Sequence, residues 1–161
     1  MFKKIAFAAV LALATSSSFA ANGTRYYAGV DLGQSEIDNY NEDLTSYGAF
    51  AGYRFNENIA LEGGLRRLGK KDGAKGDQVA VSAVFTGYAK GEWQHISLFA
   101  RLGVNRVNFD GCGSICGEDK TTGLVGLGIG YDFTPTVTGR LEYQRPTSDT
   151  SNLSVGVAYS F

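Results

Sequence analysis

Hydrophobic and polar positions alternate along this chain from residue 24 to its end. The last ten residues, NLSVGVAYSF, show the pattern most clearly, with an apolar or aromatic side chain at every second position. A period of two is the signature of a β-strand with one apolar face. The pattern predicts eight strands, within residues 25–32, 46–55, 59–66, 78–89, 95–105, 125–133, 137–144 and 153–161.

The two faces of each predicted strand differ in chemistry. One face is mainly aliphatic and aromatic, whereas the other carries glycines together with Arg, Asp and Glu. The faces of residues 78–89 are the least clear, and we take as their apolar face Val79, Val81, Ala83 and Phe85. Strands of about ten residues have the length that a tilted membrane-spanning strand requires.

The predicted connections alternate in length. Residues 56–58, 90–92 and 134–135 form tight turns, and the longer polar connections are residues 33–45, 67–77, 106–121 and 145–151. Outer-membrane barrels show short periplasmic turns and longer external loops. An even number of strands then places both ends of the barrel domain on the periplasmic side.

These features predict an all-β fold, an eight-stranded antiparallel up-and-down transmembrane β-barrel with its apolar face toward lipid. The alternative is a soluble eight-stranded barrel of the lipocalin type, whose apolar face would line a ligand cavity. Its outer face would then be rich in glycine, which makes a weak strand surface. Aromatic residues near the predicted periplasmic strand ends favour the membrane barrel, because such rings prefer the headgroup level: Tyr26, Phe55, Trp93, Phe133, Tyr159 and Phe161.

The first twenty residues have the features of a secretory signal peptide, with two lysines, a short apolar core and small residues before a cleavage site. We predict cleavage after Ala20, so that residues 1–20 are the signal peptide and residues 21–161 form the barrel domain. With residues 1–20 removed, the mature chain would carry 13 basic and 16 acidic residues. This charge balance argues against nucleic-acid binding. No run of about 20 apolar residues occurs, which excludes a transmembrane helix.

Several segments together resemble the small outer-membrane barrels of Gram-negative bacteria, of the OmpA/OmpX type: YYAGVDLG, SLFARLGV, GLGIGYDFTP, RLEYQ and NLSVGVAYSF. The resemblance covers essentially the whole mature chain. It implies Sec-dependent export, periplasmic chaperones, and a barrel-assembly machinery that reads the terminal strand, here through Tyr159 and Phe161. Large members of the family carry a further domain that binds peptidoglycan. This sequence ends at the eighth predicted strand, so that role is not implied.

The resemblance also implies a non-enzymatic outer-membrane protein without cofactors. The implied partners are outer-membrane lipids and lipopolysaccharide, with host or surface ligands at the external loops, and we expect a monomer. The alternatives are an adhesin or virulence factor acting through residues 33–45 and 106–121, a narrow ion-conducting pore, and a lipid A-modifying enzyme. Lys70, Lys71 and Lys75, with Asp72 and Asp77, form a mixed charged loop. We take this loop as solvated, with a contact to lipopolysaccharide phosphates as the alternative.

Charged residues on the polar face predict how the barrel interior is filled. Three acids and three bases fall at mid-height and sum to zero charge: Asp31, Glu62, Arg66, Arg101, Arg140 and Glu142. An eight-stranded barrel holds side chains but no open channel, and unpaired buried charges are costly. We therefore predict a lumen plugged by salt bridges and water, or alternatively a gate. Arg54 and Asp132 lie lower and would form a second pair.

Two further patterns suggest local chemistry. His95 and Ser97 match the His-x-Ser spacing of a lipid A deacylase, and spacing of two places both on one strand face. No acid lies nearby to orient the imidazole, so we predict no catalytic residue and take His95 as an interfacial or lumen group. Cys112 and Cys116 lie in the third long connection and are predicted to form a local disulfide. No metal site is predicted, since two thiols alone do not fill one.

Overall fold

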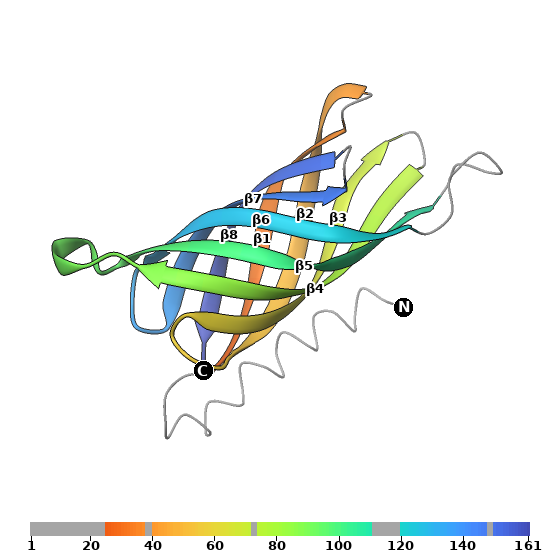
Figure 1. The fold of residues 1–161 in the computed structure, drawn as a ribbon. Helices are drawn as coiled ribbons and strands as arrows, with labels where there is room; N and C mark the ends of the chain where they lie inside the picture. The colour runs from red at the N-terminus through yellow and green to blue at the C-terminus, as the bar shows by residue number, and fades with distance from the viewer. Residues whose placement is uncertain (1–24, 38–39, 72–73, 111–119, 148–149) are drawn as a thin grey trace.

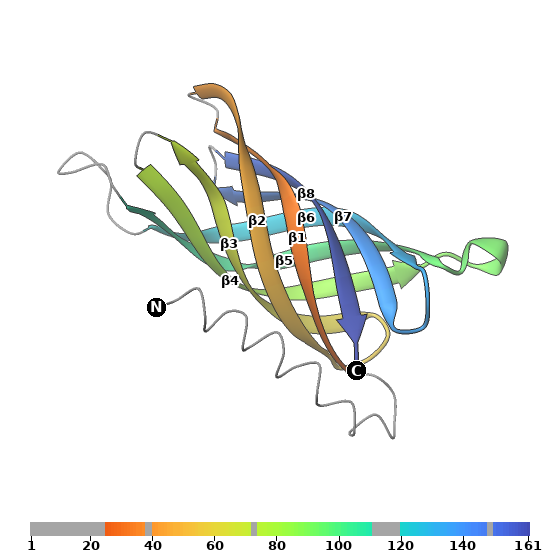
Figure 2. The same cartoon turned by 180° about the vertical axis from the view of Figure 1, so that it is seen from behind.

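The computed structural model describes residues 25–161 except 38–39, 72–73, 111–119 and 148–149. Eight consecutive antiparallel strands close into one barrel (Figure 1). They are β1 (Tyr26–Ile37), β2 (Tyr40–Arg54), β3 (Ile59–Lys71), β4 (Ala74–Tyr88), β5 (Ile96–Asp110), β6 (Lys120–Asp132), β7 (Val137–Thr147) and β8 (Thr150–Ser160). Figure 2 shows β1 and β8 side by side, where their pairing closes the barrel. The predicted eight-stranded barrel is confirmed.

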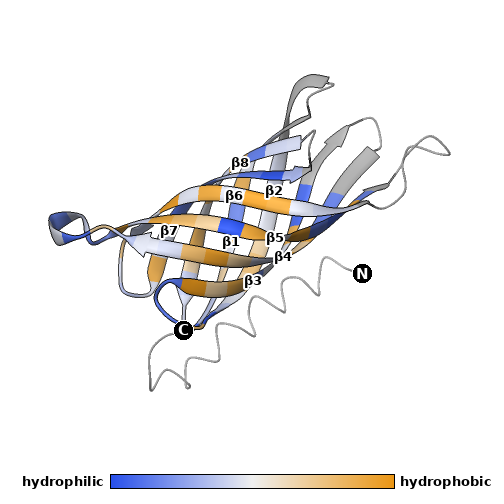
Figure 3. Cartoon of the chain, in the orientation of Figure 1, coloured by the Kyte–Doolittle hydropathy of each residue, from blue (hydrophilic) through white to orange (hydrophobic). Residues whose placement is uncertain are grey.

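Apolar side chains cover the outside of this barrel. On β1, Val30 and Leu32 are 56% and 67% exposed. Asp31, which lies between them, is buried, and so is Tyr27 earlier on the strand. The apolar positions form a band along the barrel wall (Figure 3). The faces that were least clear in the sequence, those of β4, are also confirmed, because Val79, Val81 and Phe85 point outward. Within the described residues, no helix has the length and apolarity to cross a membrane.

The strands are longer than the alternation predicted. β2, β4 and β5 each have 15 residues. The described residues of the predicted loops 33–45, 67–77, 106–121 and 145–151 are strand in the structure. The reason is that a ladder needs only backbone N–H and C=O groups, so it continues into polar sequence that lacks the alternating pattern. We call the end of the barrel where these extensions lie the loop end.

The opposite end, which we call the turn end, has the connections 55–58, 89–95 and 133–136. The middle one is longer than the predicted tight turn and projects from the barrel (Figure 1). It contains the 3-10 helix η2 (Gly91–Trp93), which Gly91 permits with a φ of 74°. The contrast between short and long connections is therefore weaker than predicted.

Aromatic rings gather on the outside of the turn end, as the sequence predicted. Tyr26 lies 5.0 Å from Tyr53 and 6.4 Å from Phe161, measured between ring centroids. Trp93 and Phe133 are 66% and 64% exposed. Such rings form the girdle that borders the apolar band of an outer-membrane barrel.

Inside the barrel, glycines make room for large aromatic rings. Each ring lies over the glycine directly opposite it on the neighbouring strand, in the pairs Tyr27 with Gly52, Phe50 with Gly29 and Phe99 with Gly128. A Cβ atom at any of these glycines would overlap the ring. The glycine content of the inner face thus reflects close packing.

The predicted signal peptide, residues 1–20, lies outside the described residues, as do Cys112 and Cys116. Both remain predictions.

Candidate functional site in the barrel lumen

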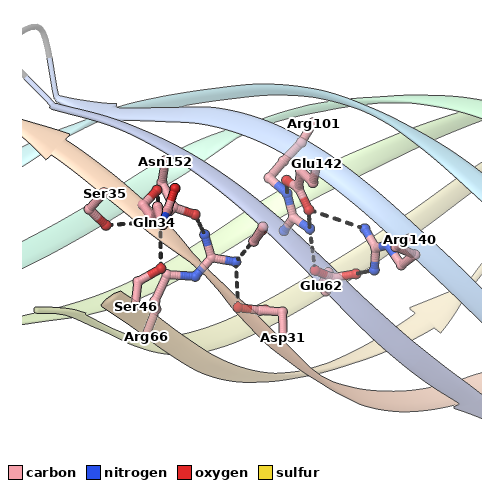
Figure 4. A network of polar contacts seen from close by, with 11 residues as sticks. Asp31, Gln34, Ser35, Ser46, Glu62, Arg66, Arg101, Arg140, Glu142 and Asn152 are labelled. Atoms are coloured by element: carbon pink, nitrogen blue, oxygen red, sulfur yellow. Dashed lines mark hydrogen bonds and ion pairs between the residues drawn. The ribbon is translucent and has the colours of Figure 1, made fainter. Parts of the chain in front are cut away.

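Four charged side chains meet at the centre of the lumen. We call them the quartet: Glu62 of β3, Arg101 of β5, and Arg140 and Glu142 of β7 (Figure 4). Arg101 Nη2 lies 2.5 Å from Glu62 Oε1, and Arg101 Nε lies 2.5 Å from Glu142 Oε1. Arg140 Nη1 lies 2.8 Å from Glu62 Oε2, and its Nη2 lies 3.6 Å from Glu142 Oε2. Each charge therefore contacts both charges of opposite sign.

Neutral groups complete the hydrogen bonds of the quartet. The hydroxyl of Tyr27 donates to Glu62 Oε2 at 2.8 Å, and Arg101 Nη1 donates to Ser82 Oγ at 2.8 Å. The Glu62 side chain is 1% exposed, and the other three are at most 10% exposed. Buried charges are tolerated when they are paired and their remaining donors and acceptors are satisfied. The quartet meets both conditions.

Aromatic rings hold one arginine of the quartet from two sides. The guanidinium carbon of Arg140 lies 4.7 Å from the ring centroid of Phe50 and 4.4 Å from that of Phe99. Both distances are within cation–π range, and such contacts strengthen when they are desolvated. The two rings in turn rest on the inward glycines of β1 and β6. Arg140 is thereby fixed by ring contacts as well as by carboxylates.

A second polar group lies on the loop-end side. Arg66 Nη2 is 2.9 Å from Asp31 Oδ1, and the same guanidinium donates to Asn152 Oδ1 and, at 3.4 Å, to Ser154 Oγ. The side-chain amide of Gln144 also lies against Arg66. Asn152 extends the group by donating to Ser46 Oγ at 2.6 Å (Figure 4). Among the described side chains, this arginine has one carboxylate partner and several neutral ones.

Two small cavities flank the quartet. The turn-end cavity has a volume of about 50 Å³ and is lined by Arg140, Phe99 and Tyr27. The loop-end cavity has a volume of about 30 Å³ and is lined by Glu62 and Arg101, among others. Each is large enough for a few water molecules. Side chains of the quartet stand between the two spaces.

The structure brings the six predicted lumen residues together as one quartet and one pair. It does not bring together Arg54 and Asp132, so that predicted pair is wrong. Arg54 donates to Ser160 Oγ at 2.8 Å and lies over the Tyr27 ring, whereas Asp132 accepts from Thr138 Oγ1 at 2.6 Å. The two residues come from β2 and β6, on opposite walls of the barrel, and each has a nearer partner.

His95 and Ser97 do not share a face. Because β5 begins at Ile96, His95 belongs to the preceding turn, is exposed, and lies 6.4 Å from the Tyr131 ring. Ser97 is 5% exposed inside the lumen. Spacing alone was therefore misleading at a strand end. Among the described residues, no group of three or more His, Cys, Asp or Glu side chains is arranged to hold a metal ion.

The sequence reasoning missed the neutral partners. Tyr27, Phe50, Phe99 and Asn152 all occupy inward positions, and the period of two places the first three on the polar face. This location could have identified the three aromatic residues as partners of the lumen charges, because an aromatic side chain on a glycine-rich inner face must lie across the lumen.

A closed eight-stranded barrel with an apolar outer band, an aromatic girdle and an ion-paired interior has the architecture of a small outer-membrane protein. Residues 5–161 match the outer membrane protein beta-barrel domain family. The chain belongs to this family, which locates it in the bacterial outer membrane.

Among curated proteins, the chain is 29% identical over 194 residues to outer membrane protein A of Escherichia coli O157:H7, covering 99% of the chain and 55% of that protein. It is 31% identical over 198 residues to outer membrane protein A of Salmonella typhi, with the same coverages. The chain thus spans about half the length of the curated relatives it matches.

Among solved structures, the fold resembles Ail, the attachment invasion locus protein of Yersinia pestis, with a TM-score of 0.56 and 18% identity. That match covers 85% of this chain and 97% of Ail. The N-terminal β-barrel domain of Pseudomonas aeruginosa OprF gives a TM-score of 0.59 at 16% identity, over 84% of this chain and 97% of that domain. At these identities the likeness concerns the fold.

Proposed function

We propose that this protein is a non-enzymatic barrel that contributes to envelope integrity, with the quartet as a fixed plug of its lumen. The observation that carries the proposal is the full pairing of Glu62, Arg101, Arg140 and Glu142 between two small cavities. A plug of this kind keeps the barrel closed and braces opposite walls, because β3 and β7 are four strands apart. The separation of His95 from Ser97 supports the absence of catalysis.

Envelope integrity is tested in cells. A strain lacking the gene is expected to become sensitive to detergent and to large antibiotics, and the wild-type gene should restore resistance. A Glu62→Gln variant that still inserts should restore it only in part. Heat-modifiable gel mobility of the membrane fraction reports insertion. Full resistance of the deletion strain under envelope stress would contradict the proposal.

A second candidate is a narrow pore, favoured by the two cavities on either side of the quartet. If the quartet opens, these spaces would join. Planar bilayers distinguish the two functions: a fixed plug gives no conductance in the wild type, whereas a gate gives small openings that Glu62→Gln makes more frequent.

A third candidate is attachment through the loop end, in line with the similarity in fold to Ail, an attachment invasion locus protein. The segments concerned are those at and beyond the extended strands, around residues 33–45 and 106–121. Replacing residues 111–119 by a short Gly-Ser linker should abolish binding to host cells if this function holds. Unchanged binding would exclude that segment as the adhesive surface.

The terminal strand carries the proposed assembly signal. Tyr159 is half exposed, and the Phe161 ring stacks at 6.4 Å on both Tyr159 and Tyr26. Its backbone N–H donates to the Tyr26 carbonyl at 2.9 Å, so the last residue is tied to the first strand. Phe161→Ala should slow insertion by the purified assembly machinery while leaving spontaneous folding into detergent nearly unchanged. Equal slowing in both would indicate a merely structural role.

Two proposals concern processing. Cleavage after Ala20 predicts a mature chain beginning at Ala21, which N-terminal sequencing of the membrane protein tests.

A disulfide between Cys112 and Cys116 predicts that neither thiol is alkylated when the purified protein is treated without reductant, which mass spectrometry measures. Two labelled thiols in the purified protein would refute the bridge.

A further inference from the structure

The two cavities beside the quartet differ in the charges that line them. The turn-end cavity is lined by two guanidinium groups, those of Arg54 and Arg140, and by no carboxylate of the described residues. The loop-end cavity is lined by two arginines and two carboxylates: Asp31, Glu62, Arg66 and Arg101. The wall of the turn-end cavity therefore carries positive charge, and the acids that balance it lie elsewhere.

Arg54 is the last residue of β2 and reaches the cavity from the turn end. Its Nη1 donates to Ser160 Oγ at 2.8 Å, and its guanidinium carbon lies 4.7 Å from the centroid of the Tyr27 ring. Within the described part of the chain, no carboxylate forms an ion pair with Arg54. A guanidinium has five N–H donors in a planar fork, so Arg54 retains donors for an anionic ligand.

Arg140 borders the same cavity from inside the barrel. Figure 4 shows it at the edge of the quartet that faces away from Arg66 and Asp31. Its Nη1 lies 2.8 Å from Glu62 Oε2, but the 3.6 Å between its Nη2 and Glu142 Oε2 is the longest contact of the quartet. Glu62 lines the loop-end cavity and Arg140 the turn-end cavity. The guanidinium of Arg140 is thus the charged group of the quartet that faces the turn end.

A hydroxyl group, a glycine and an opening to solvent complete the cavity. Ser97 and Gly130 both line it, and Ser97 Oγ occupies the space into which a Cβ atom at Gly130 would extend. Tyr88 also lines the cavity and is 42% exposed, which gives the cavity access to solvent at the turn end. A volume of about 50 Å³ accommodates a ligand of about four heavy atoms.

Two acids lie at the turn end near this cavity. Asp132, the last residue of β6, accepts from Thr138 Oγ1 at 2.6 Å, and Glu57 is exposed in the turn 55–58. Neither acid lines the cavity. Their negative charges offset part of the long-range attraction for an anion, so binding has to depend on direct contacts with Arg54 and Arg140.

We propose that the turn-end cavity binds one small oxyanion, a monocarboxylate or inorganic phosphate, between Arg54 and Arg140. Both guanidinium groups donate to oxygens of the anion, and the hydroxyl of Ser97 supplies a neutral donor. Carboxylate and phosphate suit this arrangement, because a guanidinium donates parallel N–H groups to their oxygens. The inference goes beyond the proposed function, since the site exists whether the quartet is a fixed plug or a gate.

The test uses the purified protein in neutral detergent micelles, with its arginine side chains labelled with ¹⁵N and observed by NMR. Acetate and phosphate are titrated separately at constant ionic strength. The Nε–Hε signals of Arg54 and Arg140 should shift and reach saturation with at least one of the two anions. Saturation with acetate alone would assign the site to carboxylates, and saturation with phosphate alone would assign it to phosphate.

Three variants locate the site. Arg54→Gln should weaken binding about tenfold or more, because a charge-assisted contact is lost. Arg25→Gln is the matched control: it removes an exposed arginine at the same end that does not line the cavity, and it should bind like the wild type. Ala60→Val adds two methyl groups to the cavity wall beside Arg54, its ladder partner, and should weaken binding without changing any charge.

Each contrary result overturns the proposal. Signals of Arg54 and Arg140 that do not saturate with either anion would exclude the site in the wild type, even where a variant fails to fold. Unchanged binding by folded Arg54→Gln or Ala60→Val would place the anion outside the cavity, and an equal loss in Arg25→Gln would show general attraction to positive charge. Heat-modifiable gel mobility reports the folding of every variant.

Discussion

Two sets of arginine–carboxylate contacts in this barrel have similar geometry and opposite surroundings. Inside, Arg101 contacts Glu62 and Glu142 at 2.5 Å, with side chains at most 8% exposed. Outside, Arg67 contacts Asp77 at 2.7 Å, with side chains 39% and 38% exposed. The chemical groups are nearly the same, and the difference lies in the solvent around them.

That difference decides what each contact does for the protein. An exposed ion pair is screened and contributes at most about 1 kcal/mol. Breaking a buried pair costs about 3–5 kcal/mol, since one charge is left unpaired in a poorly solvated space. The inner contacts therefore define a unique arrangement of the lumen. The outer contact mainly orients one side chain.

The largest effect is expected at the centre of the quartet. Glu62→Gln keeps the shape but leaves a net positive charge among Arg101, Arg140 and Glu142. We expect a loss of about 3 kcal/mol in the free energy of unfolding, measured by reversible urea titration in lipid vesicles. Combining it with Arg140→Gln restores neutrality and should recover part of the loss. A single variant as stable as the wild type would show that the quartet does not stabilise the barrel.

Glycines inside and outside the barrel give the next contrast. Gly128→Ala would place a Cβ against the Phe99 ring, which packs on Arg140, and should cost about 1–3 kcal/mol. Gly123→Ala is the matched control, because it points outward into open space. Urea titrations of both variants measure the difference. If both variants had the same free energy of unfolding, the Phe99 ring would be able to move away from the added Cβ without destabilising the barrel.

The Asp31–Arg66 pair should respond less than the quartet. Asp31→Asn removes the one carboxylate that contacts Arg66, but the guanidinium keeps Asn152, Ser154 and the amide of Gln144. We expect a loss of about 1–2 kcal/mol by the same titration. A loss as large as that of Glu62→Gln would show that neutral partners do not substitute for a carboxylate in this lumen.

The smallest effect is expected outside. Asp77→Asn should change the free energy of unfolding by less than about 1 kcal/mol, and the change should shrink further in high salt. The free energy of unfolding of this variant and of Asp31→Asn, measured at low and at high salt, distinguishes an exposed ion pair from a buried one. If Asp77→Asn lowered the free energy of unfolding strongly and equally at low and high salt, the Arg67–Asp77 pair would behave like a buried ion pair.

The alternation of side chains made most of the fold predictable. The eight strands, the outward Val79 and Phe85, and the inward Asp31 and Glu62 all follow from a period of two. Closure follows from the need to leave no unpaired strand edge in lipid. The strand ends were less predictable, because backbone pairing continues into polar sequence that carries no periodic signal. The same uncertainty at the start of β5 made His95 and Ser97 look like residues of one face.

The alternation of side chains did not predict which acid pairs with which base. Arg101 and Glu142 are 41 residues apart, and their contact depends on strand register and on the reach of both side chains. The predicted partnership of Arg54 and Asp132 failed for this reason, since equal height in a barrel does not mean proximity across it. The aromatic rings around Arg140 likewise depend on the glycines that face them.

The sequence by itself determined the strand count, the apolar outer band and an interior whose six central charges sum to zero, because these properties depend on local alternation. The tertiary structure alone decided the division of those charges into a fully paired quartet and a pair with neutral partners. Such groupings depend on register and closure, which bring together residues distant in the chain only when all eight strands are in place.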